Sequence, residues 1–270
     1  MTLFYALILI GGVMQCSAHA LTVEQLDKQI ERKVNALTPP QSSQTIAHKL
    51  MSNFLGYDDT DEPSRRIRRG SENLVRARRK SESYNVVYLI DSSNSLGQRN
   101  FTIALNALKL LTSKSRPGTR FAAITFADTA RISFPFTTRK EAYRQLSKVP
   151  FIAGTTNTQE ALNLAQRELF GKKNSGATPG AIGRVLIITD GLSNVQRNLT
   201  LFNAYKLKMA GPEIYVVAVG QYLYGLHELV GLASSTENHL FRAQSMRGLE
   251  GAVRLIPKPS MYRKYYKHRN

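Results

Sequence analysis

The chain has 270 residues, and its 37 lysines and arginines exceed its 19 acidic residues, which gives a formal net charge of +18. This length accommodates one full domain with additional segments. The single cysteine, Cys16, excludes a disulfide framework, so stability must come from a packed core. The charge fits either an ordinary basic surface or an anionic partner, and alone it does not choose between them.

The first twenty residues have the pattern of a secretory signal peptide. An apolar stretch from Leu3 to Val13 is followed by Ala18-His19-Ala20, a small-x-small cleavage pattern. Cys16 lies inside this segment, so the exported chain would contain no cysteine. No later run approaches the roughly 18 apolar residues that a membrane span requires. We therefore expect a secreted, extracellular protein without a membrane span, and nucleic acid is not an expected partner.

Two amphipathic helices are predicted next. Residues 21–37 begin with a possible capping box, and residues 39–40 are prolines that end this helix. A second helix is predicted from Ser43 to Leu55, because Ile46, Leu50 and Phe54 share one face and Gly56 follows. Two short helices bury too little apolar surface to form a domain alone.

Residues 58–83 are highly charged and nearly free of large apolar side chains, which is typical of an exposed linker. Two R-x-R-R sequences, 66–69 and 76–79, resemble proprotein-convertase sites. The alternative is a solvated run of charge. We predict cleavage after Arg69 or Arg79, which makes residues 21–79 a helical propeptide and basic linker that precede a domain at 80–256.

Strand and helix patterns alternate regularly from residue 84 onward. Such alternation predicts an α/β fold: a doubly wound, mostly parallel sheet with helices on both faces. The segment 130–136 alternates in polarity and contains Pro135, which favours an antiparallel strand at the edge. The buried strands are predicted at 86–90, 121–126, 185–189 and 214–219, and the helices at 100–111, 140–148, 158–169, 201–210, 226–233 and 246–256.

Polar residues gather at three positions next to these elements. DSSNS (91–95) and TDG (189–191) each follow or end a strand, and AGTTNT (153–158) precedes a helix. Functional sites of such sheets lie beyond the carboxyl ends of the strands. The expected site contains only oxygen donors, which suit Mg²⁺, Mn²⁺ or Ca²⁺; DSSNS alone could equally be a helix N-cap. The residues expected to meet there are Asp91, Ser93, Ser95, Thr156 and Asp190.

In this pattern, residues 84–256 resemble the von Willebrand factor type A domain. D-x-S-x-S, the threonine of AGTTNT and the aspartate of VLIITDG occur in the family's order. The resemblance implies a metal-ion-dependent adhesion site, with Mg²⁺ the expected cation. It also implies that Ser93 and Ser95 bind the cation directly and that Thr156 does so in the open state, whereas Asp91 and Asp190 often act through water. The predicted domain contains no cysteine, whereas many matrix relatives close the ends of the domain with a disulfide.

Enzymatic interpretations find little support in the sequence. Neither a P-loop nor a G-x-G-x-x-G follows a strand. The histidines beyond the signal are scattered without metal-ligand spacing, and none accompanies the Ser and Asp of the expected site as a base. We therefore expect that the protein is not an enzyme. These histidines are His48, His227, His239 and His268.

Two further features concern the surface of the protein. Asn100 and Asn198 begin N-x-T acceptor sequences for N-glycosylation. Residues 257–270 form a basic, tyrosine-containing tail that could bind anionic polymers through Lys258, Arg263, Lys264, Lys267 and Arg269.

Two functions remain open at this point. The first is a secreted adhesion or matrix-binding module, whose cation is completed by a carboxylate of an extracellular matrix or cell-surface protein. The alternative is a basic matrix scaffold protein that binds sulfated or acidic polymers electrostatically, with the metal only structural. One fold can serve both.

Overall fold

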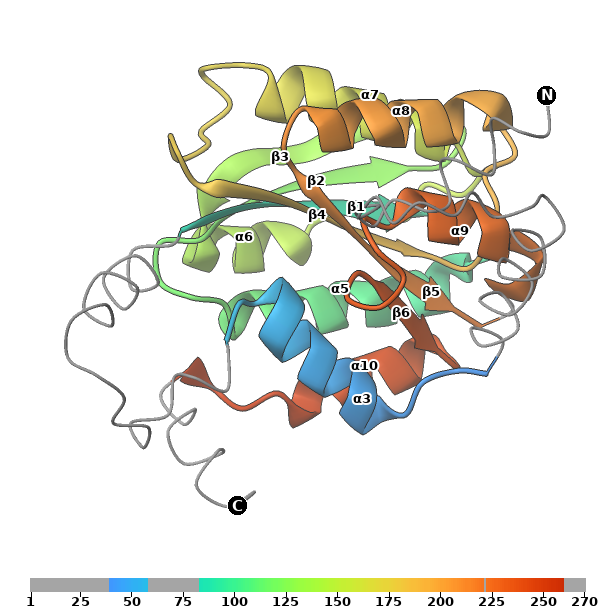
Figure 1. Cartoon of the computed structure of the whole chain (residues 1–270), viewed down its shortest axis with the longest axis horizontal. Helices are drawn as coiled ribbons and strands as arrows, with labels where there is room; N and C mark the ends of the chain where they lie inside the picture. The colour runs from blue at the N-terminus through green and yellow to red at the C-terminus, as the bar shows by residue number, and fades with distance from the viewer. Residues whose placement is uncertain (1–38, 58–82, 221, 260–270) are drawn as a thin grey trace, which may run out of the picture.

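The computed structural model describes residues 39–57, 83–220 and 222–259 (Figure 1). Six strands form one sheet in the order β3-β2-β1-β4-β5-β6. All neighbouring strands are parallel except β2 and β3, which pair antiparallel. The strands are β1 Tyr84–Asp91, β2 Arg120–Phe126, β3 Ala130–Thr138, β4 Ile182–Thr189, β5 Glu213–Val219 and β6 Leu240–Ala243.

The predicted fold class is confirmed, including the antiparallel edge strand. Strand β1 is buried along its whole length because β2 and β4 flank it and helices cover both of its faces. Strand β3 shows mixed burial, as expected at an edge, and Pro135 is tolerated there. Strand β6 was missing from the predicted strands, because four residues are too few to show a period.

Helices cover both faces of the sheet (Figure 1). One face is covered by α7 (Thr158–Leu164), its π-helical continuation η3 (Ala165–Phe170), α8 (Arg197–Met209) and α9 (Leu226–Leu232). The other is covered by α5 (Gly97–Ser113), α6 (Arg139–Leu146) and α10 (Met246–Leu255). A short 3₁₀ turn, η4, spans Tyr222–Gly225. All six helices predicted after residue 84 are confirmed, with ends that differ by a few residues.

The sheet divides the core into two hydrophobic clusters. Side chains alternate along β1, so Val87 and Leu89 belong to one cluster while Val86 and Tyr88 belong to the other. A strand that feeds both clusters must be apolar on both faces, which explains its near-continuous hydrophobic sequence.

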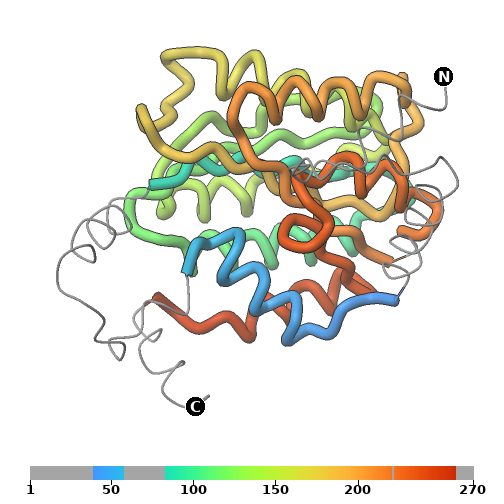
Figure 2. The backbone as a smooth tube through the Cα atoms, viewed as in Figure 1, coloured from blue at the N-terminus to red at the C-terminus, as the bar shows by residue number. Residues whose placement is uncertain are grey.

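The predicted helix after the prolines is also confirmed. It comprises α3 (Ser43–Lys49) and a π-helical continuation, η1 (Leu50–Phe54), and Ser42 caps its start by accepting a hydrogen bond from the Thr45 amide. This segment lies beside α10 (Figure 2). Its predicted apolar face is buried in the cluster that also contains α5 and α10.

Several predictions fall on residues outside the described ranges. These are the signal peptide, the helix at 21–37, both R-x-R-R sequences with Arg69 and Arg79, and the tail beyond residue 259. Within the described ranges, no helix is both long and apolar enough to cross a membrane.

Two glycines give a paired test of this packing. Gly56 ends η1 with φ +70°, and an added Cβ would overlap the Tyr84 hydroxyl. We therefore expect Gly56→Ala to lower the free energy of unfolding by about 1–3 kcal/mol. Gly251 lies within α10, where an added Cβ meets nothing within 4 Å. There, Gly251→Ala should instead raise stability by about 0.5–1 kcal/mol.

Urea denaturation of both variants and the wild type measures the two effects. Equal stability of Gly56→Ala and wild type would contradict the close approach of residue 56 to Tyr84.

Candidate metal centre

Three loops meet at one edge of the sheet. Strands β1 and β4 are parallel neighbours, with Ile90 opposite Ile188, so the loops after them emerge side by side. The loop before α7 joins them: the Asn94 amide donates to the Gly154 carbonyl at 2.9 Å. The expected meeting of these three segments at the carboxyl ends of the strands follows directly from the topology.

Asp91 lies at the buried bottom of this site. Its carboxylate accepts hydrogen bonds from the Ser93 amide at 2.9 Å and from the Thr189 hydroxyl at 2.7 Å. Burial raises the pKa of Asp91 to about 6, because desolvation of the carboxylate outweighs these hydrogen bonds. Burial also raises the pKa of Asp190, against the opposing effect of its hydrogen bond with Ser95.

A chain of hydrogen bonds connects four of the five predicted residues, beginning with the bond from the Ser93 amide to Asp91. The Ser93 and Ser95 hydroxyl oxygens lie 3.1 Å apart, and Ser95 donates to the Asp190 carboxylate at 3.1 Å. Ser93 is buried whereas Ser95 is exposed. The cluster therefore runs from the buried Asp91 to a solvent-facing end.

Thr156 is held in the same region through its backbone. Its amide donates to the Asn194 side-chain oxygen at 2.6 Å, and its carbonyl accepts from the Asn194 amide at 3.0 Å. Two left-handed residues, Ala153 (φ 65°) and Gly154 (φ 125°), turn the chain just before it. A Cβ at Gly154 would lie 2.7 Å from the Asp128 carboxyl group, so this loop requires glycine there.

Four residues that support the site are not among the predicted site residues. Thr189 binds Asp91, and Asn194 holds Thr156. Asp128 accepts hydrogen bonds from the Thr155 amide and hydroxyl at 2.7 and 2.6 Å. The buried Glu228 accepts from the Ser193 amide at 2.8 Å. Thr189 lies within the TDG sequence and Asn194 lies three residues after it, but nothing local distinguishes any of the four from ordinary loop or helix residues.

The donor set fits a hard cation. All five predicted side chains offer oxygen, and in the described ranges neither Asp91 nor Asp190 forms a salt bridge with a basic side chain. No group of three or more His, Cys, Asp or Glu residues gathers among the described residues. With only two carboxylates, the site depends on hydroxyl oxygens, which suit Mg²⁺ or a similar ion better than a closed Ca²⁺ cage.

A family model of the von Willebrand factor type A domain matches residues 85–254, and the chain belongs to this family. Over 176–178 residues, it is 29% identical to integrin alpha-X of Mus musculus, 28% to cochlin of Bos taurus and 29% to the collagen alpha-6(VI) chain of Homo sapiens. Each match covers 63% of this chain but only 15%, 31% and 8% of these relatives, respectively.

The fold is also similar to that of proximal thread matrix protein 1 from the mussel byssus. One crystal form superposes with a TM-score of 0.59 at 21% identity, over 65% of this chain and 47% of that one. A second structure, described as having a zinc-occupied MIDAS (metal-ion-dependent adhesion site) motif, gives a TM-score of 0.55 at 25% identity. The superposition covers 66% of this chain and 45% of that one.

Both predicted glycosylation sites lie near this edge of the sheet. Asn100 and Asn198 are exposed in the first turns of α5 and α8, the helices that follow the two strand-end loops. The Asn100 side chain donates to the Leu96 carbonyl at 2.9 Å, and Thr200 of the second acceptor sequence is buried. Use of either site stays a prediction.

The site yields a direct test of metal binding. Asp190 lies at a half-buried strand end, so Asp190→Ala removes a carboxylate without opening a large core cavity. A pair of charges near a surface interacts by about 4 kcal/mol at an effective dielectric of ~20. Loss of half of this interaction should weaken Mn²⁺ or Mg²⁺ affinity more than about tenfold. Isothermal titration calorimetry measures this, with circular dichroism as the check of folding.

The matched control is Glu141→Ala, which removes an equal charge from the surface of α6. Its cation affinity should equal that of wild type. Retention of full affinity by a folded Asp190→Ala protein would contradict the assignment of Asp190 to the metal centre.

Proposed function

We propose that this protein is a secreted, non-enzymatic adhesion or matrix-binding module. Its target would be a matrix or cell-surface protein that presents an acidic side chain. The observation that carries this proposal is the contact between Ser95 and Asp190, which links two loops into an oxygen-only cluster with one solvent-facing end.

Each site residue of this chain has its own role in holding the cation. Asp91 lies at the buried base, and its hydrogen bonds with Ser93 and Thr189 fix its orientation before any ligand arrives. The hydroxyls of Ser93 and Ser95 present neutral oxygens rather than further negative charge. A Mg²⁺, Mn²⁺ or Ca²⁺ ion held by so few carboxylates keeps an affinity for one more, which the partner protein would supply. Thr156, positioned by Asn194, completes the proposed donor set.

The similarity to integrin alpha-X, cochlin and a collagen chain supports an extracellular role. The zinc-occupied MIDAS motif of the mussel protein supports a divalent cation. Among the described residues, no histidine forms a hydrogen bond with the five site residues, whereas metal-activated hydrolysis would need a general base beside the cation.

A second candidate function is favoured by a basic groove between α5 and α10. The groove has a volume of about 600 Å³ and is lined by Arg99, Arg247 and Arg254, with Glu250 paired to Arg254 at 2.6 Å. Guanidinium groups match the geometry of sulfate oxygens. Of the predicted tail cations, Lys258 alone falls within the described residues, and it follows α10 directly. A sulfated polymer would bind in this groove through Arg99, Arg247 and Arg254.

The cation should control binding to the protein ligand. We expect a chelator to abolish retention of wild-type protein on a matrix extract, and Mg²⁺ or Mn²⁺ to restore it, while Asp190→Ala stays unbound throughout. High salt should do less than chelator, because a coordinated carboxylate is screened less than an exposed one. Release by salt but not by chelator would contradict the adhesion mechanism and favour the scaffold alternative.

The groove should control binding to heparin. The double variant Arg247→Ala/Arg254→Ala should elute from heparin at lower salt than wild type, with a shallower salt dependence, because it loses two exposed charges. The double variant Arg131→Ala/Arg167→Ala carries the same charge change at other elements and serves as control. Equal elution of the two variants would exclude the groove as the binding surface.

A further inference from the structure

The helical segment before the basic linker is built into the hydrophobic core. Ile46, Leu50, Met51 and Phe54 are each 1–2% exposed and belong to the same cluster as α10 and one face of the sheet. The Phe54 ring packs edge-on against Tyr215 of β5, with centroids 5.1 Å apart. The interior of the domain is therefore completed by residues that precede the linker.

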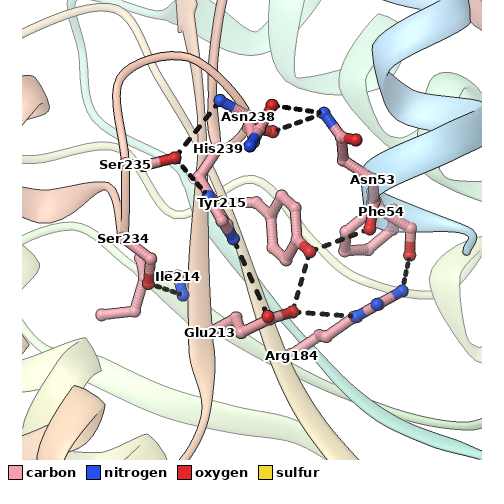
Figure 3. A network of polar contacts seen from close by, with 10 residues as sticks. All are labelled: Asn53, Phe54, Arg184, Glu213, Ile214, Tyr215, Ser234, Ser235, Asn238 and His239. Carbon is pink, nitrogen blue, oxygen red and sulfur yellow. Dashed lines mark hydrogen bonds and ion pairs between the residues drawn. The ribbon is translucent and has the colours of Figure 1, made fainter. Parts of the chain in front are cut away.

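A polar network anchors the end of this segment (Figure 3). The Tyr215 hydroxyl lies 2.9 Å from the Asn53 carbonyl and 2.8 Å from the Glu213 carboxylate. The guanidinium group of the buried Arg184 donates to the Phe54 carbonyl, and its Nε lies 3.3 Å from Glu213. Two backbone carbonyls of the segment thus satisfy polar groups of the sheet.

Both ends of the segment are tied to other elements as well. Gln41 covers the edge strand β6: its amide donates to the Arg242 carbonyl at 2.8 Å, and its side chain accepts from the Arg242 amide at 3.1 Å. At the other end, the Tyr57 hydroxyl donates to the carbonyl of Lys114, just after α5, at 3.2 Å. The segment is therefore held along its whole length and shields an otherwise open sheet edge.

Removal of this segment would leave the domain incomplete. The Arg184 guanidinium would lose its hydrogen bond to the Phe54 carbonyl and keep only its contacts with Glu213 and aromatic rings of the sheet. The Tyr215 ring and its neighbours in the cluster would be exposed as an apolar patch. Both effects oppose release of the segment.

The anchoring network also lies away from the metal centre. Arg184 and Glu213 are near the amino ends of β4 and β5, whereas the site loops follow the carboxyl ends. These anchors hold the C-terminal part of the segment at the end of the sheet opposite the site loops, whereas Gln41 contacts Arg242 near the carboxyl ends of β5 and β6.

We propose that residues 41–57 form a noncovalently held element of the folded domain. A cut anywhere in residues 58–82, which contain both R-x-R-R sequences, then leaves a two-chain protein instead of releasing the segment as a propeptide. The docking surface of this segment is formed by α10, β6 and the amino ends of β4 and β5. Its occupant is this chain's own residues 41–57.

An engineered cut tests this directly. A recognition sequence for a specific protease replaces residues 70–75 in the full chain, and the folded protein is cleaved after purification. We expect the two pieces to co-elute in size-exclusion chromatography and to separate in denaturant. Elution of the N-terminal piece on its own in native buffer would overturn the proposal, whether the remaining domain stays soluble or aggregates.

Variants identify the contacts responsible. In the cut protein, Phe54→Ala should weaken retention of the N-terminal piece by more than about a hundredfold, measured from its dissociation on dilution. Gln44→Ala, on the exposed face of α3, should leave retention unchanged. If the uncut Phe54→Ala chain does not fold, Phe54→Leu replaces it with a smaller expected loss. Retention of the Phe54 variant at wild-type strength would overturn the proposed docking surface.

A second readout separates this proposal from the metal centre. The cut, two-chain wild type should bind Mn²⁺ with the affinity of the uncut chain. Failure of metal binding in both forms would contradict the proposed function and leave the two-chain result standing.

Discussion

The burial of β1 on both faces is the constraint on which the rest of the structure depends. Because β2 and β4 flank this strand and helices cover it from both sides, its apolar residues feed both hydrophobic clusters. The same strand ends in Asp91, which carries a carboxylate into the interior. The Asp91 carboxylate therefore lies at the carboxyl end of β1, where the loops of neighbouring parallel strands can surround it with polar groups.

That buried carboxylate explains the composition of the surrounding loops. Desolvation raises its pKa, and hydrogen bonds with Ser93 and Thr189 oppose this effect. A salt bridge to an arginine or lysine would neutralise the charge permanently. Within the described ranges, Asp91 forms no such salt bridge. We propose that a divalent cation instead balances the two carboxylates of this site, so that the unfavourable burial of the Asp91 carboxylate is offset when the cation binds.

The two ends of the sheet serve different purposes. At the carboxyl ends, short polar loops hold side chains whose partners are one another. At the amino ends, Arg184 and Tyr215 donate to the Phe54 and Asn53 carbonyls of the segment before the linker. The Glu213 carboxylate contacts both of these donors, and Phe54 completes the core beside them. Separation of these roles allows loops at one end to vary for recognition while packing at the other end maintains stability. It also means that the boundary of the packed unit differs from the boundary suggested by the charged linker.

Periodicity and motif order in the sequence determined the α/β class, five of the six strands and the helices after residue 84, because each of these depends on local spacing. The same reasoning identified the loops that contain Asp91, Ser93, Ser95, Thr156 and Asp190, since parallel strands necessarily bring their carboxyl ends to one edge. The tertiary structure alone decided the remainder. Strand β6 is too short to show a period and exists through its pairing with β5. The packing of Phe54 against Tyr215 and the hold of Asn194 on Thr156 join residues far apart in the chain, and no local pattern encodes such contacts.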